Sequence, residues 1–130
     1  MKLLGVDHID IVVKDLKSSI AFYKTFGMAL EGSLDNGQTV FMWNGDHQNP
    51  VRIELHQAAG DEETGIDHLS FRVEDPLDST KEAEFQGIEF LFEPFENHQS
   101  GRTISNCYDP DDIQIQICKQ TSPGTYKNWE

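Results

Sequence analysis

The chain has 130 residues, the size of one ordinary domain, and carries 23 Asp and Glu against 10 Lys and Arg, which gives a formal net charge of −13. A field of that sign repels phosphate backbones and anionic membrane surfaces, so we expect neither nucleic acid nor a membrane as a partner. No apolar run approaches the ~20 residues of a membrane helix. The 2 cysteines are too few for a disulfide scaffold, and the N-terminus lacks the layout of a secretory signal, so we expect reduced thiols and a cytoplasmic protein.

A near repeat divides the sequence into two halves. The run Val6–Val13 (VDHIDIVV) returns as Ile66–Val73 (IDHLSFRV), so His8 corresponds to His68 at an offset of 60 residues (68 − 8). The same offset relates three further pairs, Asp15 with Asp75, Ser19 with Ser79, and Gly27 with Gly87. An offset that runs through a strand, a helix start and a helix end indicates two homologous modules, about 1–57 and 65–119, followed by a tail at 120–130.

The first module follows the order strand, helix and three strands. Residues 3–13 alternate between two faces, as a half-buried strand does. Asp15 suits a helix N-cap, apolar residues recur at helical spacing from Leu16, and Gly27 suits the helix end. Strands are predicted at about 28–33, 38–43 and 50–57, and the Asn36-Gly37 pair between the first two is a strong hairpin signal.

The second module repeats this order. We predict a strand at 65–74, a helix from Pro76 to about Gln86 with Asp75 as its cap, and strands at about 88–92, 102–108 and 113–119. The apolar stripe of this helix is thinner than that of the first, which predicts a more exposed helix. Residues 58–64 connect the modules, and the tail either frays or packs Trp129 on a neighbour. In a chain of this size the two modules must share one core, which predicts a single domain of the α+β class.

Alternation along four strands predicts which polar side chains share a face. In the first module the strand at 3–13 and the strand at 50–57 present one set, which comprises His8, Asp10, Arg52, Glu54 and His56. In the second module the corresponding strands present His68, Ser70, Arg72, Gln114, Gln116 and Cys118. Glu54 corresponds to Gln116 at an offset of 62 (116 − 54). Each half therefore supplies one histidine from its first strand and one Glu or Gln from its last.

Two histidines with one or two oxygen ligands suit a divalent metal that keeps open coordination positions. The predicted ligands are His8, Glu54, His68 and Gln116, and the ion is Zn, Ni, Co, Mn or Fe. The alternative is that these residues form the solvent face of an antiparallel sheet, where polar residues cost nothing. The equivalent placement in both halves favours the metal.

Three more residues are candidates for substrate binding. Arg52 and Arg72 suit a substrate carboxylate, because a guanidinium binds a carboxylate through two parallel hydrogen bonds. Either arginine equally suits a structural ion pair with Asp10 or Glu54. His56 shares the face of Glu54 and either lines the pocket or lies in water at the strand end.

Taken together, these residues resemble the vicinal oxygen chelate superfamily, which includes glyoxalase I, methylmalonyl-CoA epimerase, extradiol dioxygenases, fosfomycin-resistance enzymes and bleomycin-binding proteins. The resemblance covers about residues 5–119 and rests on the paired modules, the Asp-His-Ile and Asp-His-Leu openings, Arg52–Leu55 (RIEL) and Asp109–Ile117 (DPDDIQIQI). It implies an open β-barrel with the helices outside, a metal held on the concave face by His8, Glu54, His68 and Gln116, and a homodimer.

The resemblance further implies a metal-dependent lyase or isomerase of glyoxalase type, which acts on a small substrate with vicinal oxygens through an enediolate and uses Glu54 as its catalytic base. Gln116 departs from the family, where a glutamate is usual; an amide oxygen coordinates a metal but cannot act as a base. A metal-free small-molecule binding protein of the bleomycin-binding type is the alternative. An extradiol-type oxygenase ranks third, and a fosfomycin-type transferase is disfavoured by Gln116.

Overall fold

The computed structural model describes residues 1–126, so the predicted contact of Trp129 lies outside the described residues. The chain divides into two compact units. The unit that we call the His8 unit comprises His8–Asp67 and Tyr126, and the His68 unit comprises Met1–Asp7 and His68–Thr125. The strands β1 (Leu3–Val13) and β5 (Gly65–Val73) contribute residues to both units.

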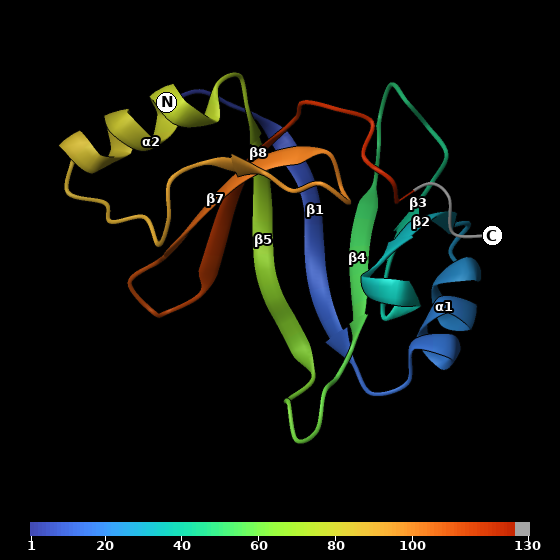
Figure 1. Ribbon diagram of the computed structural model, residues 1–130. Helices are drawn as coiled ribbons and strands as arrows, with labels where there is room; N and C mark the ends of the chain where they lie inside the picture. The colour runs from blue at the N-terminus through green and yellow to red at the C-terminus, as the bar shows by residue number, and fades with distance from the viewer. Residues whose placement is uncertain (127–130) are drawn as a thin grey trace. The chain divides into compact units, whose positions relative to one another are not determined.

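The His8 unit has the predicted order of strand, helix and three strands. After β1 come α1 (Leu16–Lys24), β2 (Ala29–Leu34), a one-turn 3-10 helix η1 (Asp35–Gly37), β3 (Thr39–Trp43) and β4 (Arg52–Gln57). The strands lie in the order β2-β3-β4-β1, with β1 and β4 parallel and the other neighbours antiparallel (Figure 1). The hairpin between β2 and β3 turns where predicted, through positive φ angles at Asn36 and Gly37.

The aliphatic face of this sheet packs against α1. Val13, Val40, Met42 and Leu55 form the buried cluster, and Leu16, Ile20 and Tyr23 of α1 pack on it. Asp15 caps the helix as predicted, because its carboxylate accepts from the backbone N–H of Ser18 at 3.5 Å and from the Ser18 hydroxyl at 2.9 Å. Since side chains alternate along a strand, packing Val13 and Leu55 against α1 turns His8, Asp10, Glu54 and His56 to the opposite face.

The His68 unit contains α2 (Pro76–Phe85), β6 (Phe95–Glu96), β7 (Arg102–Tyr108) and β8 (Gln114–Gln120) after its part of β5. Its strands lie in the order β5-β8-β7-β6, with β5 and β8 parallel. Asp75 caps α2 by accepting from the backbone N–H groups of Leu77 at 3.0 Å and Asp78 at 3.3 Å. The helix is followed by Gly87 at φ +92°, as α1 is followed by Gly27 at φ +83°.

The strand registers confirm that the two modules are equivalent. In one module Ile9, Asp10 and Ile11 lie opposite Ile53, Glu54 and Leu55. In the other, Leu69, Ser70 and Phe71 lie opposite Ile115, Gln116 and Ile117. The first strands are related by an offset of 60 and the last strands by an offset of 62, the offsets found in the sequence. The chain is therefore an α+β protein built from two strand–helix–three-strand modules, as predicted.

Two local predictions were wrong. Residues 88–94 form no strand, and only the short β6 at Phe95–Glu96 pairs with β7. Pro94 has no N–H to donate, so the ladder cannot run through it, and Leu91 makes a single backbone bond, to the carbonyl of Asn106 at 2.8 Å. The second helix is also the more buried of the two: it buries Pro76, Ser79, Thr80 and Ala83, whereas α1 buries no residue fully. These four side chains are small, so a count of large apolar residues misses their burial.

Gly32 makes room for the end of the described chain. A Cβ atom on Gly32 would lie 2.2 Å from the carbonyl oxygen and 2.5 Å from Cδ2 of Tyr126. Tyr126 is buried against Leu34 and Phe41, and its carbonyl oxygen accepts from the N–H of Ser33 at 2.7 Å. A side chain on Gly32 would therefore displace Tyr126.

We expect Gly32→Ala to lower the free energy of unfolding by about 1–3 kcal/mol, the usual cost of overpacking a core, and to free the Tyr126 ring. Urea unfolding and the ring resonances of Tyr126 measure both effects. Gly37→Ala is the matched control: Gly37 has a positive φ but no atom within 4 Å of its Cβ position, so this change should lower stability and leave the Tyr126 resonances unchanged. Equal resonance shifts in both variants would contradict the steric explanation.

Candidate functional site

His8 and Glu54 form the centre of the candidate site in the His8 unit. His8 lies on β1 and Glu54 on β4, and His8 Nε2 is 3.0 Å from Glu54 Oε2. The two side chains are 2% and 13% exposed, so they meet in a largely water-excluded place. Two atoms bound to one first-row cation at ~2.1 Å and at about a right angle lie ~3.0 Å from each other. The spacing of this pair therefore fits two neighbouring metal ligands.

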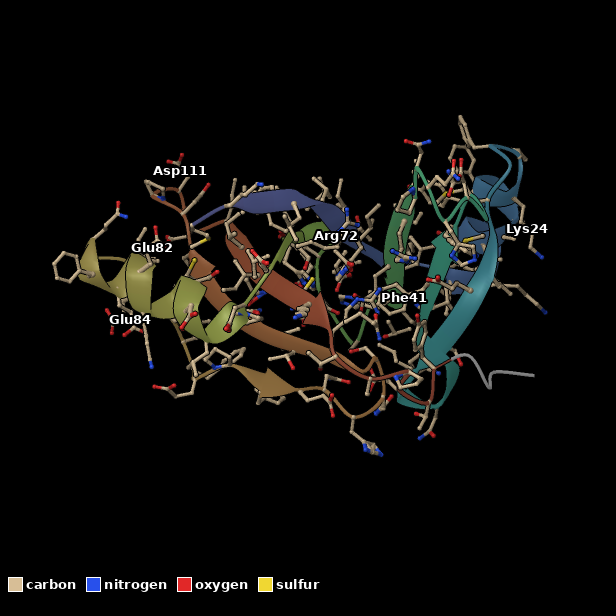
Figure 2. All side chains as sticks on the ribbon, turned by 90° about the horizontal axis from the view of Figure 1, so that it is seen from above. Lys24, Phe41, Arg72, Glu82, Glu84 and Asp111 are labelled. Atoms are coloured by element: carbon tan, nitrogen blue, oxygen red, sulfur yellow. The ribbon has the colours of Figure 1, made fainter. Side chains whose placement is uncertain are left out.

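Aromatic side chains hold the His8 ring in place. The ring of Phe41, which is labelled in Figure 2, meets the His8 ring edge to face, with 5.3 Å between the ring centroids and an interplanar angle of 83°. The ring of Tyr126 in turn packs against Phe41, with 5.4 Å between the two ring centroids. Both aromatic residues are buried, and such pairs add about 0.5–1.5 kcal/mol each beyond the area that they bury. The imidazole of His8 is thus oriented before any ligand binds.

The next residues along the same two strands form a second pair. His56 Nδ1 lies 2.8 Å from Asp10 Oδ1, and His56 Nε2 lies 3.5 Å from Glu62 Oε2. Burial lowers the pKa of His56, but the carboxylates of Asp10 and Glu62 outweigh that effect, so its pKa lies above the usual value. His56 is therefore neither a solvated strand end nor unpaired: its ring is held between carboxylates.

Arg52 has a structural partner. Its Nε and Nη2 donate to the two carboxylate oxygens of Glu31 at 2.7 and 2.9 Å, and the guanidinium lies over the Trp43 ring, 5.5 Å from its centroid. A bidentate pair of this kind uses the fork that a substrate carboxylate would need. The ion-pair alternative raised by the sequence is thus present, with Glu31 as the partner rather than Asp10 or Glu54.

Gln116 belongs to a hydrogen-bonded chain of amides in the His68 unit, in which Gln116 and Asn106 are buried and Gln114 is half-buried. The Ser70 hydroxyl donates to Gln116 Oε1 at 2.9 Å, and Gln116 Nε2 donates to Asn106 Oδ1 at 3.2 Å. Asn106 Nδ2 in turn donates to Gln114 Oε1 at 3.2 Å. These bonds leave one orientation for the Gln116 amide, in which Oε1 keeps a second lone pair for a further donor or a cation.

The remaining predicted residues of this unit are His68, Arg72 and Cys118. His68 is buried at 8% exposure, and alternation along β5 places it on the face of Ser70. Arg72, labelled in Figure 2, donates through Nη2 to the carbonyl of Leu4 at 3.4 Å. Burial, reinforced by Asp7, raises the pKa of the Cys118 thiol to about 12, so Cys118 remains a protonated thiol and acts as a small buried residue.

An apolar pocket of about 830 Å³ lies elsewhere in the His68 unit, between residues 87–91 and 107–110. Ile88, Leu91, Tyr108 and Ile115 line it, and it includes none of the predicted site residues. No sequence pattern indicated this pocket, which lies where the strand expected at 88–92 is absent.

Comparison with known proteins agrees with this arrangement of modules. Residues 5–117 match the Glyoxalase/Bleomycin resistance protein/Dioxygenase superfamily. The chain therefore belongs to that superfamily, the one its sequence motifs resemble. No curated protein sequence matches the chain. Among the described residues, none of the helices is long and apolar enough to cross a membrane.

Solved structures with the same fold include methylmalonyl-CoA epimerases. A variant of the Streptomyces coelicolor enzyme in complex with 2-nitronate-propionyl-CoA has a TM-score of 0.76 at 17% identity, over 93% of this chain and 100% of that one. The Mycobacterium tuberculosis epimerase has a TM-score of 0.70 at 22% identity, over 89% and 87%. A hypothetical protein from Bacillus halodurans C-125 has a TM-score of 0.66 at 20% identity, over 87% and 91%. At these identities the likeness extends to the fold.

Proposed function

We propose that the protein is a metal-dependent lyase or isomerase that acts on a small substrate with vicinal oxygens through an enediolate. The observation that carries the proposal is the buried His8–Glu54 pair, with an Nε2–Oε2 separation of 3.0 Å. Superfamily membership and the fold shared with methylmalonyl-CoA epimerases support it. The proposal includes a homodimer, on the strength of the family resemblance.

The proposed metal ligands are His8, Glu54, His68 and Gln116. Each comes from a first or last strand of its module, at equivalent registers. The donor set of two imidazoles, one carboxylate and one amide oxygen suits Zn, Ni, Co, Mn or Fe in the divalent state. A bound divalent ion would polarise a substrate carbonyl and make the neighbouring carbon acid easier to deprotonate.

Glu54 is the proposed base. In the proposed ligand set it is the single carboxylate, so it alone can take a proton from the substrate carbon and return it. His8 Nε2 lies 3.0 Å from Glu54 Oε2, so the two side chains would occupy neighbouring positions around a bound ion. Because both groups are largely shielded from water, a water molecule competes poorly with Glu54 as the base. Removal of a proton next to a carbonyl and its return to the neighbouring carbon of the enediolate, the two proton steps of an isomerisation, need only one such base.

Metal content followed by proton exchange tests the proposal. Protein purified without chelator should contain at least about one divalent ion per chain, and it should exchange the α-proton of methylmalonyl-CoA, or of the hemithioacetal of methylglyoxal, with solvent deuterium. Chelation should abolish the exchange and re-addition of metal should restore it. Protein that contains no metal, binds none on addition and still binds a small molecule would belong with the bleomycin-binding type instead.

Gln116→Glu is expected to tighten metal binding, because it adds one negative charge to the ligand set. Part of the gain is offset: a carboxylate cannot donate to Asn106 Oδ1, so the Asn106 amide must turn and lose its bond to Gln114, worth about 1 kcal/mol. We expect the dissociation constant to fall on the order of tenfold. Calorimetric titration of the stripped protein measures it, and weaker binding than wild type would argue against Gln116 as a ligand.

A further inference from the structure

The ring of His56 is held in the way that metal-binding histidines are held. Its Nδ1 is 2.8 Å from the carboxylate of Asp10, which is 5% exposed on β1. A buried carboxylate that bonds one ring nitrogen fixes the tautomer and the orientation of the ring, and it makes the other nitrogen a better ligand. The other nitrogen, Nε2, points to the loop that follows β4.

Glu62 and Asp67 supply two carboxylates beside the His56 ring. The ligand atoms of His56, Glu62 and Asp67 all lie within 4.8 Å of one another, and Nε2 is 3.5 Å from Glu62 Oε2. Ligand atoms at ~2.1 Å from a tetrahedral ion lie ~3.4 Å apart, close to the 3.5 Å between His56 Nε2 and Glu62 Oε2. The ligand atom of Asp67 lies within 4.8 Å of the other two, so a side-chain adjustment on the order of 1 Å completes the set.

The loop holds Glu62 in position. Its Oε1 accepts from the backbone N–H of Ala59 at 3.1 Å, and its own N–H donates to the Ala59 carbonyl at 3.0 Å. One carboxylate oxygen is thus anchored to the backbone while the other is directed at His56. This arrangement limits the side-chain entropy that ligand binding would otherwise cost.

Charge also favours a cation here. Asp10, Glu62 and Asp67 all act on His56 electrostatically. Three carboxylates around one imidazole leave a net charge of −2 even when the ring is protonated. The rest of the chain, at a formal charge of −13, adds to the attraction for a cation rather than opposing it.

We propose a second divalent metal site formed by His56, Glu62 and Asp67, with Asp10 as the residue that orients His56. One nitrogen and two carboxylate oxygens suit a first-row ion such as Zn²⁺, whereas Ca²⁺ would need six or more oxygens. All four residues lie in the His8 unit, and none of them belongs to the proposed ligand set of the isomerase site. In the second module the positions of Asp10 and His56 are held by Ser70 and Cys118, so the site has no counterpart there.

Zn²⁺ titration of the full chain, stripped with EDTA, tests the site. We follow side-chain ¹H–¹⁵N spectra, in which His56 Nε2 should shift to the range of a metal-bound nitrogen. Glu62→Gln and Asp67→Asn should each weaken this Zn²⁺ binding at least tenfold. Glu63→Gln and Asp61→Asn remove the same charge from the same loop and should leave it unchanged.

Asp10→Asn provides an independent variant. An asparagine keeps an oxygen that can accept from Nδ1–H but carries no charge, so it makes Nε2 a weaker ligand, and Zn²⁺ binding at His56 should weaken about 10- to 100-fold. Because the signal is specific to His56, it is not affected by whether an ion binds at His8 and Glu54. An unchanged His56 resonance in the presence of Zn²⁺, or an equal loss in Glu62→Gln and Glu63→Gln, would overturn the proposal.

Discussion

Glu54→Gln is expected to lower α-proton exchange by a factor on the order of 10² or more at saturating metal, because it removes a positioned base. Glutamine has the same shape and keeps an oxygen for the metal, but its amide accepts no proton at neutral pH. In the wild-type protein Glu54 Oε2 lies 3.0 Å from His8 Nε2, and the Glu54 side chain is only 13% exposed. Water therefore has poor access to take over as base.

The control for this variant is Glu63→Gln, which removes one carboxylate from the exposed loop between the modules and should leave exchange at the wild-type rate. Metal content is measured on the same samples, so that loss of the ion is separated from loss of the base. Full exchange by Glu54→Gln with metal bound would show that Glu54 is not the base. Loss of the ion together with exchange would instead identify Glu54 chiefly as a ligand.

The internal repeat is the reason that so much of the fold could be predicted. Each local signal occurs once in each module: Asp15 and Asp75 cap the two helices, and Gly27 and Gly87 follow the helix ends with positive φ angles. Strand alternation then assigned faces correctly, since the side chains of His8 and Glu54 do meet. A period of two fixes every side chain of a strand once one buried residue is known.

Pairings that depend on irregular backbone could not be predicted. Glu31, the partner of Arg52, lies on β2 where the register with β3 shifts between Leu30 and Gly32, and alternation does not extend through such a bulge. Residues 88–94 also form no strand, and pairing with β7 is limited to the short β6 at Phe95–Glu96, after Pro94. Neither the bulge in β2 nor the loss of this strand follows from the alternation of apolar and polar residues.

The Asp10–His56 pair also follows from strand alternation, although the sequence did not suggest it at first. His8 meets Glu54 and Asp10 meets His56, each at a separation of 46 residues along the chain. Parallel strands in register repeat a contact every two residues, so the first pair implies the second. The Asp10–His56 pair could therefore have been inferred from the predicted metal ligands, which would have placed His56 among carboxylates rather than in water.

A buried ion pair in the His68 unit was beyond any local pattern, because its members are 95 residues apart in sequence. Arg102 Nε donates to Asp7 Oδ2 at 2.8 Å, and the two side chains are 3% and 5% exposed. Removing one partner of such a pair leaves a charge buried without compensation, which typically costs about 3–5 kcal/mol. We expect Asp7→Ala to lower the free energy of unfolding by that amount, measured by urea denaturation.

The double variant Asp7→Ala/Arg102→Met decides whether the pair itself is responsible. With both charges gone, no buried charge remains, so the double variant should be more stable than Asp7→Ala alone even though it carries one more substitution. Asp111→Ala, which removes an exposed carboxylate in the turn before β8 (Figure 2), should change stability by no more than about 0.5 kcal/mol. Strictly additive losses in the double variant would mean that Asp7 and Arg102 act independently. The cost of Asp7→Ala would then come from lost packing at the start of β1 rather than from an uncompensated charge buried in the interior.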